Sequence, residues 1–164
     1  MMKSLTQWIL ALVLTLSAVG ESRSQGCMTN LYGRERQSLN GKWNVLVDLY
    51  DQGRKNRIYE NRQPQGKSDF YEYAFEGGLR LDVPGDWNSQ TPELMFYEGT
   101  VWYARRFDAP QRAGRRLFLH FGAVNYRCRV YLNGEPVGEH EGGFTSFQFE
   151  VTDRVRENGN LLVV

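Results

Sequence analysis

The chain has 164 residues, of which 41% are hydrophobic and 24% are charged. Its 20 lysines and arginines almost balance 19 aspartates and glutamates, so the net charge of +1 excludes strong electrostatic attraction to nucleic acid or another polyanion. Aromatic residues at 13%, together with 17 glycines, favour an all-β fold with many turns.

The N-terminal segment has the order of features found in an export signal. Lys3 supplies a positive charge, residues 8–19 form an apolar stretch, and small residues follow it. About a dozen apolar residues are too few for a membrane span, which needs about 20. We therefore predict a signal peptide over residues 1–24, export to the periplasm or the extracellular space, and no membrane span.

The two cysteines leave two alternatives open for Cys27. It could be acylated after cleavage, which would anchor the exported chain to a membrane. It could instead form a disulfide with Cys128 in an oxidising compartment. Cys128 lies on the same strand face as Val130 and Leu132, and this pattern predicts a small buried core residue at position 128.

After a polar lead-in over residues 25–38, alternating apolar side chains predict a series of strands, because successive strand residues point to opposite faces. Each strand should turn an apolar face to the core and a more polar face outward. Asn133-Gly134 predicts a tight hairpin turn, and Gly142-Gly143 predicts a second bend. The predicted strands are 43–49, 79–83, 100–107, 117–121, 126–132, 137–140, 147–152 and 161–164.

Three segments are harder to place. Residues 51–68 are charged and contain Gly53, Pro64 and Gly66, which predicts a loop without assigned chemistry. Residues 70–75 are aromatic and fit either a short strand or a helical turn. Residues 161–164 form an apolar run that nothing closes, so we expect a chain truncated inside its domain.

Five motifs stand in an order that resembles a known family. They are LNGKW at 39–43, VPGDW at 83–87, VWY at 101–103, VYLNGEPVGEHEGGF at 130–144 and FEVTD at 149–153. In this order they resemble the N-terminal sugar-binding domain of glycoside hydrolase family 2, which includes β-galactosidases, β-glucuronidases and β-mannosidases. The resemblance implies a jelly-roll β-sandwich of about eight antiparallel strands over residues 39–164, related to galactose-binding domains.

The resemblance also implies where catalysis takes place. Family 2 enzymes hydrolyse β-glycosides with retention through two glutamates on a (β/α)₈ barrel. No residue of this sequence matches those motifs, so we expect no catalytic residue and no cofactor in the chain, and a barrel downstream that shares the carbohydrate substrate. A homo-oligomer of the full-length enzyme stays open. His120 and His140 have no cysteine at ligand spacing, so we expect no metal site.

The loop after Val83-Pro84-Gly85 supplies the candidate sugar contacts, Asp86, Trp87 and Asn88. The resemblance places Asp86 where related β-galactosidases hydrogen-bond a sugar hydroxyl, and a carboxylate suits that role because charge-assisted hydrogen bonds are strong. Alternatively, Asp86 caps the turn. Trp87 either stacks on a sugar face or anchors the loop.

Two further alternatives concern function. A carbohydrate-binding module without hydrolase activity is the rival to the enzyme domain. A group of arginines fits either an anionic substrate such as a uronate or a solvated sheet face balanced by acids. These are Arg105, Arg106, Arg112, Arg115, Arg116, Arg127 and Arg129.

Overall fold

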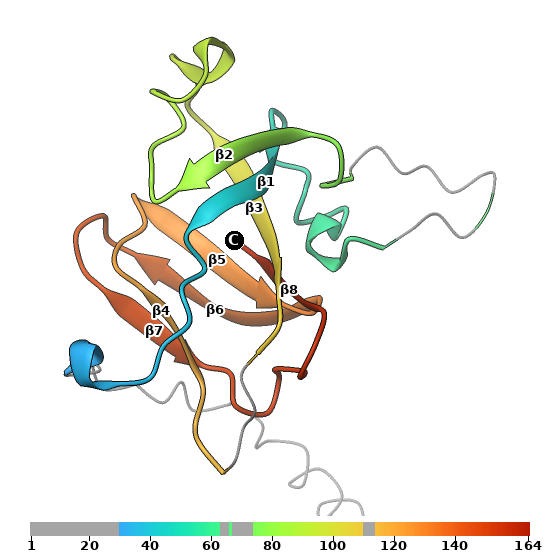
Figure 1. Ribbon diagram of the computed structural model, residues 1–164. Coiled ribbons are helices and arrows are strands. Elements are labelled where there is room, and N and C mark those ends of the chain that lie inside the picture. Colours follow the sequence, from blue (N-terminus) through green and yellow to red (C-terminus); the bar gives the residue numbers. More distant parts are fainter. Residues whose placement is uncertain (1–29, 63–65, 67–73, 110–113) are drawn as a thin grey trace, which may run out of the picture.

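A computed structural model describes residues 30–62, 66, 74–109 and 114–164 (Figure 1). The predicted signal peptide, Cys27 and most of the ambiguous 70–75 segment lie outside these ranges. The described chain forms three short 3-10 helices, η1 (Leu31–Gly33), η2 (Ile58–Glu60) and η3 (Pro92–Leu94). Its strands are β1 (Gly41–Asp48), β2 (Leu79–Val83), β3 (Thr100–Phe107), β4 (Phe118–Phe121), β5 (Arg127–Leu132), β6 (Glu135–Glu141), β7 (Phe147–Glu150) and β8 (Asn160–Val163).

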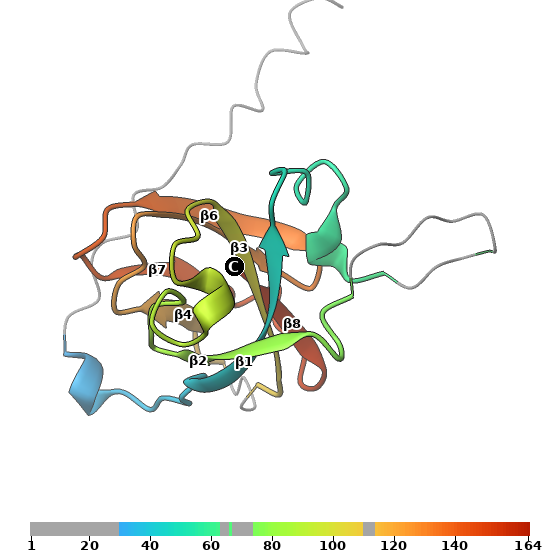
Figure 2. The same cartoon turned by 90° about the horizontal axis from the view of Figure 1, so that it is seen from above.

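The strands form two antiparallel sheets, which confirms the predicted β-sandwich. The larger sheet has the order β2-β1-β3-β8-β5-β6, and β4 pairs with β7 in the smaller one. Figures 1 and 2 show the smaller sheet as a second layer beside β5 and β6. The predicted hairpin at Asn133-Gly134 is present, since both residues have positive φ and Leu132 pairs with Glu135 across the turn.

The main core lies between the two sheets. Its buried side chains come from both layers and include Leu132, which is 0% exposed, and Leu162, which is 1% exposed. Cys128 belongs to this core as predicted: its free thiol is buried, and the loss of hydration raises its pKa to about 11. The other members of the cluster are Trp43, Leu119, Val130 and Val151.

The opposite face of the larger sheet is also covered, which corrects the expectation of a polar outer face. Trp102 and Tyr131 point to this face and are both 5% exposed. Ile58, the first residue of η2, and Phe75 pack against them. Residues 51–62, part of the segment 51–68 predicted as a loop without assigned chemistry, therefore close a second core.

A buried carboxylate fixes this covering segment to the sheet. Asp48, only 4% exposed, ends β1. One carboxylate oxygen accepts a hydrogen bond from the Gln52 amide at 3.0 Å. The other accepts bonds from the Gly53 amide at 2.7 Å and from the Trp102 indole at 3.0 Å. Without the carboxylate, the Gly53 amide and the Trp102 indole would be buried donors without a partner.

Acids pair with most of the arginines that the sequence singled out. The Arg116 guanidinium makes a two-pronged contact to Glu150, and this contact is the main reason that the pKa of Glu150 falls to about 2. Ion pairs also join Arg106 to Glu76 and Arg115 to Glu35. Arg105 instead donates to the Lys42 carbonyl. No helix within the described ranges is long and apolar enough to cross a membrane.

Candidate functional site

The candidate site residues lie on the loop over residues 84–99, which connects β2 to β3. The loop carries η3 and rises above the sheets in Figure 1. Leu94 of η3 is buried and packs with Val45 of β1 and Leu81 of β2 in a third apolar cluster. The loop therefore covers the inner face of the larger sheet at β1 and β2, and its position relative to the strands is fixed by packing.

Asp86 is exposed and is held by its own turn. One carboxylate oxygen accepts the Ser89 amide at 2.9 Å, and the other accepts the Ser89 hydroxyl at 2.8 Å. These bonds lower the pKa of Asp86, with the hydroxyl as the larger cause. The turn-capping contacts are thus present. They also leave lone pairs on both oxygens of an oriented, ionised carboxylate that faces solvent.

Trp87 and Asn88 support the loop from within. The Trp87 indole donates to the Tyr97 carbonyl at 3.2 Å, and its half-buried ring packs against the third cluster. The Asn88 amide donates to the carbonyls of Leu94, Met95 and Tyr97 at 2.7, 3.3 and 3.2 Å. The structure therefore brings the three predicted residues together. Asp86 faces solvent, whereas Trp87 and Asn88 donate their side-chain hydrogen bonds to backbone carbonyls of the loop.

Gln90 is a positioning residue that the sequence did not single out. Its carbonyl oxygen accepts the Asp82 amide at 2.7 Å. Its amide nitrogen donates to the carbonyls of Asp82 at 3.0 Å and Asp86 at 3.1 Å. Gln90 thus ties the end of β2 to the Asp86 turn. A glutamine in a polar loop looks solvated in sequence, so nothing in the pattern distinguishes it.

Tyr103 lies close enough to Asp86 for the charge of the carboxylate to act on it. The half-buried Tyr103 of β3 has a raised pKa, mainly through burial and secondly through the negative charge of Asp86. Phe96, 91% exposed, and Met95 lie on the same loop. Within the described residues, no group of three or more histidines, cysteines or acids is placed to hold a metal ion. The exposed Asp86 carboxylate can accept hydroxyl donors, and the same loop exposes apolar side chains. A sugar ring offers partners for both kinds of contact.

Comparison with known protein families gives one match that covers most of the chain. Residues 36–164 match the family described as "Glycosyl hydrolases family 2, sugar binding domain". The match includes every strand of the two sheets and the Asp86 loop.

Curated relatives and solved structures agree with this match. The chain is 34% identical over 132 residues to the β-glucuronidase of Felis catus, covering 75% of the chain and 19% of that protein. It is 32% identical over 109 residues to the β-galactosidase of Thermoanaerobacter pseudethanolicus, covering 62% and 15%. A solved β-glucuronidase from an uncultured Clostridium superposes with a TM-score of 0.63 at 32% identity, covering 77% of this chain and 21% of the other. The chain therefore spans about a fifth of the length of these relatives.

Proposed function

Because the chain belongs to glycosyl hydrolase family 2 through its sugar-binding domain, we propose that it is the carbohydrate-contacting N-terminal domain of an exported β-glycosidase. The observation that carries this proposal is the match of residues 36–164 to the sugar-binding domain. The relatives that share this domain are whole proteins about five times as long as the region that they share with this chain. Several of these relatives are β-glucuronidases, which favours a β-glucuronide as the substrate of the whole enzyme.

In this proposal the domain binds and positions the substrate, and a downstream barrel performs the hydrolysis. The barrel supplies the two glutamates of a retaining mechanism. The β2–β3 loop packs as one wall of the substrate pocket, and Asp86 accepts a hydrogen bond from a sugar hydroxyl. The exposed Met95 and Phe96 are available to contact the barrel or the aglycone.

Reading the coding DNA beyond the codon for Val164 tests this proposal directly. We expect an open frame of several hundred codons that encodes a barrel with paired glutamates. The full-length product should hydrolyse p-nitrophenyl β-D-glucuronide faster than the matching β-galactoside, whereas the 164-residue chain should hydrolyse neither. A stop codon directly after Val164 would instead favour a carbohydrate-binding module without hydrolase activity, and turnover by the short chain would contradict the assignment of catalysis to the barrel.

The sugar contact of Asp86 is tested by Asp86→Asn in the full-length enzyme. Asparagine keeps an acceptor for the Ser89 amide, so the turn should survive. Loss of the charge should lower kcat/KM about 10- to 100-fold, the effect of one charge-assisted hydrogen bond. Ser89 holds the pKa of Asp86 below its ordinary value, so the carboxylate stays charged on acidification. The ratio of kcat/KM between the wild type and Asp86→Asn should therefore be constant from about pH 5 to about pH 8.

The matched control for Asp86→Asn is Asp82→Asn. Asp82 is an exposed carboxylate on β2, the strand that leads into the Asp86 loop, and it pairs with Lys42 at 2.8 Å. Its replacement should leave kcat/KM within about twofold, since an exposed ion pair contributes little. Unchanged kinetics in the Asp86 variant, together with a lower unfolding temperature, would leave Asp86 with a turn-capping role alone.

A further inference from the structure

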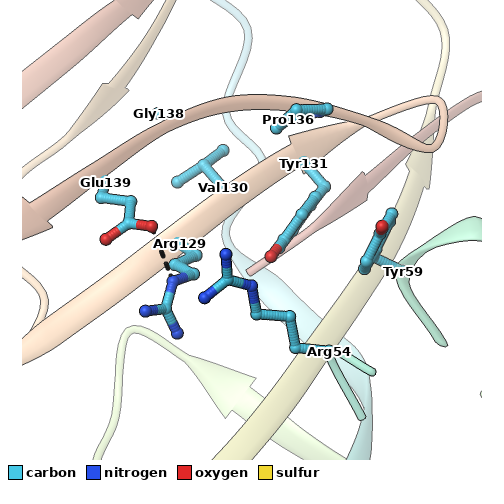
Figure 3. A pocket seen from close by; sticks show the side chains of 8 residues that line it. All are labelled: Arg54, Tyr59, Arg129, Val130, Tyr131, Pro136, Gly138 and Glu139. Atoms are coloured by element: carbon cyan, nitrogen blue, oxygen red, sulfur yellow. Dashed lines mark hydrogen bonds and ion pairs between the residues drawn. The ribbon is translucent and has the colours of Figure 1, made fainter. Parts of the chain in front are cut away.

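A second concave site lies on the face of the larger sheet that is turned away from the Asp86 loop. It is a pocket of about 190 Å³ between residues 54–59 and the β5–β6 hairpin (Figure 3). Tyr131, on its floor, belongs to the outer apolar cluster with Trp102. Tyr103, whose pKa is raised by burial and then by the charge of Asp86, packs with the inner clusters. The sheet itself therefore separates this pocket from the candidate sugar contact.

The floor of the pocket is aromatic. The rings of Tyr59 and Tyr131 stack with their centroids 4.1 Å apart and their planes 9° from parallel. The ring of Trp102 lies next to them, with its centroid 5.9 Å from that of Tyr131. A tyrosine hydroxyl is protonated at neutral pH, so the hydroxyl of Tyr131 can donate a hydrogen bond. Burial raises its pKa further. Figure 3 shows this hydroxyl directed toward the guanidinium groups of the pocket.

The rim of the pocket carries an excess of positive charge. The Glu139 carboxylate is shared, accepting from Arg129 at 2.7 Å and from Arg127 at 3.0 Å. Asp51 is the other nearby acid that acts on Arg129, and it accepts a hydrogen bond from Thr100. Arg54 forms no ion pair with any residue that the structure describes. Of the residues that line the pocket, Arg54 and Arg129 are positive and Glu139 is negative, so the lining carries one excess positive charge. Arg54, which no described acid pairs with, is free to bind an anion.

The segment that carries Arg54 is held in place from both ends. The Asp48 carboxylate binds the amides of Gln52 and Gly53 just before it. After it, Ile58 is 3% exposed in the outer cluster, and its amide donates to the Gly53 carbonyl at 3.0 Å. The backbone around Arg54 is therefore fixed against the sheet, which reduces the entropy that a ligand must overcome on binding.

We propose that this pocket binds a uronic acid residue, with Arg54 as the anchor for the sugar carboxylate. A guanidinium offers two parallel N–H donors that match the two oxygens of a carboxylate. Glu139 and the Tyr131 hydroxyl supply an acceptor and a donor for ring hydroxyls. The excess of one positive charge suits a monoanion better than a phosphate dianion. Ligand pockets for drug-sized molecules have volumes of about 300–1,000 Å³, so this smaller one admits a single sugar ring.

The proposal adds a second carbohydrate site to the domain and does not depend on catalysis by the whole enzyme. The two sites are separable by mutation, because they share no residue.

Isothermal titration of the 164-residue chain with D-glucuronate, D-glucose and acetate tests the proposal. We expect D-glucuronate to bind in the millimolar range and the other two to bind at least tenfold more weakly, because glucose lacks the charge and acetate lacks the hydroxyls. Arg54→Gln should weaken glucuronate binding about tenfold. The side chain is exposed, so the variant should fold normally, which circular dichroism checks.

Two control variants make the result specific. Lys55→Gln removes the same charge from the next residue, which does not line the pocket, and should leave glucuronate binding within about twofold. Equal affinity of the wild type and Arg54→Gln would overturn the proposal, as would equal binding of glucose or acetate. Loss of glucuronate binding in Asp86→Asn would place the bound sugar at the β2–β3 loop instead.

Discussion

Replacing Asp48 by alanine should lower the free energy of unfolding by about 3–5 kcal/mol. The change removes three hydrogen bonds and leaves the Gly53 amide and the Trp102 indole buried without an acceptor. Each unsatisfied buried donor costs about 1–3 kcal/mol. Urea denaturation followed by tryptophan fluorescence measures the loss. Hydrogen exchange should show the Gly53 amide losing protection in the folded variant, since its acceptor is gone.

Asp82→Ala is the matched control for this experiment. Both carboxylates lie on neighbouring strands of one sheet, but the Asp82 side chain is 59% exposed and binds Lys42 at the surface. Its removal should cost about 0–1 kcal/mol. A similar small loss in Asp48→Ala would show that water reaches the Gly53 and Trp102 donors, and the account of the covering segment as an anchored layer would be wrong.

Gly138→Ala should lower the free energy of unfolding by about 2–3 kcal/mol through overpacking. A β-carbon at this position of β6 would overlap the ring of Phe149 on β7. That ring cannot turn away freely, because it meets Phe147 edge-on at 5.7 Å and Phe121 at 6.5 Å. The two sheets would have to separate locally, which the urea midpoint and the aromatic circular dichroism signal would both report.

Gly122→Ala provides the corresponding control. An added β-carbon there meets nothing within 4 Å, and the backbone does not require positive φ. Alanine should therefore be neutral or stabilising by about 0.4–1 kcal/mol, because it restricts the unfolded chain. Equal destabilisation by both substitutions would show that general loss of glycine flexibility, not contact with Phe149, sets the stability.

The strands and the Asp86 turn could be predicted from sequence because both depend on local patterns. Alternation predicted β5 with Cys128 and Val130 on its inner face, and Asn133-Gly134 predicted the hairpin that follows. The carboxylate of Asp86 lies three residues from the amide that it binds, within one turn. Such short-range features follow from residue type and spacing alone.

The covering segment could not be predicted because its contacts join distant parts of the chain. Asp48 and Trp102 are 54 residues apart, and an aspartate before a charged stretch looks solvated. The outer aromatic residues did carry a sign of burial, since Tyr131 and Trp102 are large for a solvated face. Alternation assigns a residue to a face but does not say what covers that face. The Arg54 pocket depends on the same long-range packing.

The position of β8 has a consequence for the order in which the domain assembles. Of the described strands, β8 alone joins the β2-β1-β3 half of the larger sheet to the β5-β6 half. It comes from residues 160–163, at the far end of the printed sequence. We therefore expect the two halves to stay apart during synthesis, with apolar surface exposed, until this strand leaves the ribosome. Nascent chains of this domain should be protected by a chaperone up to that length, and released once β8 is inserted.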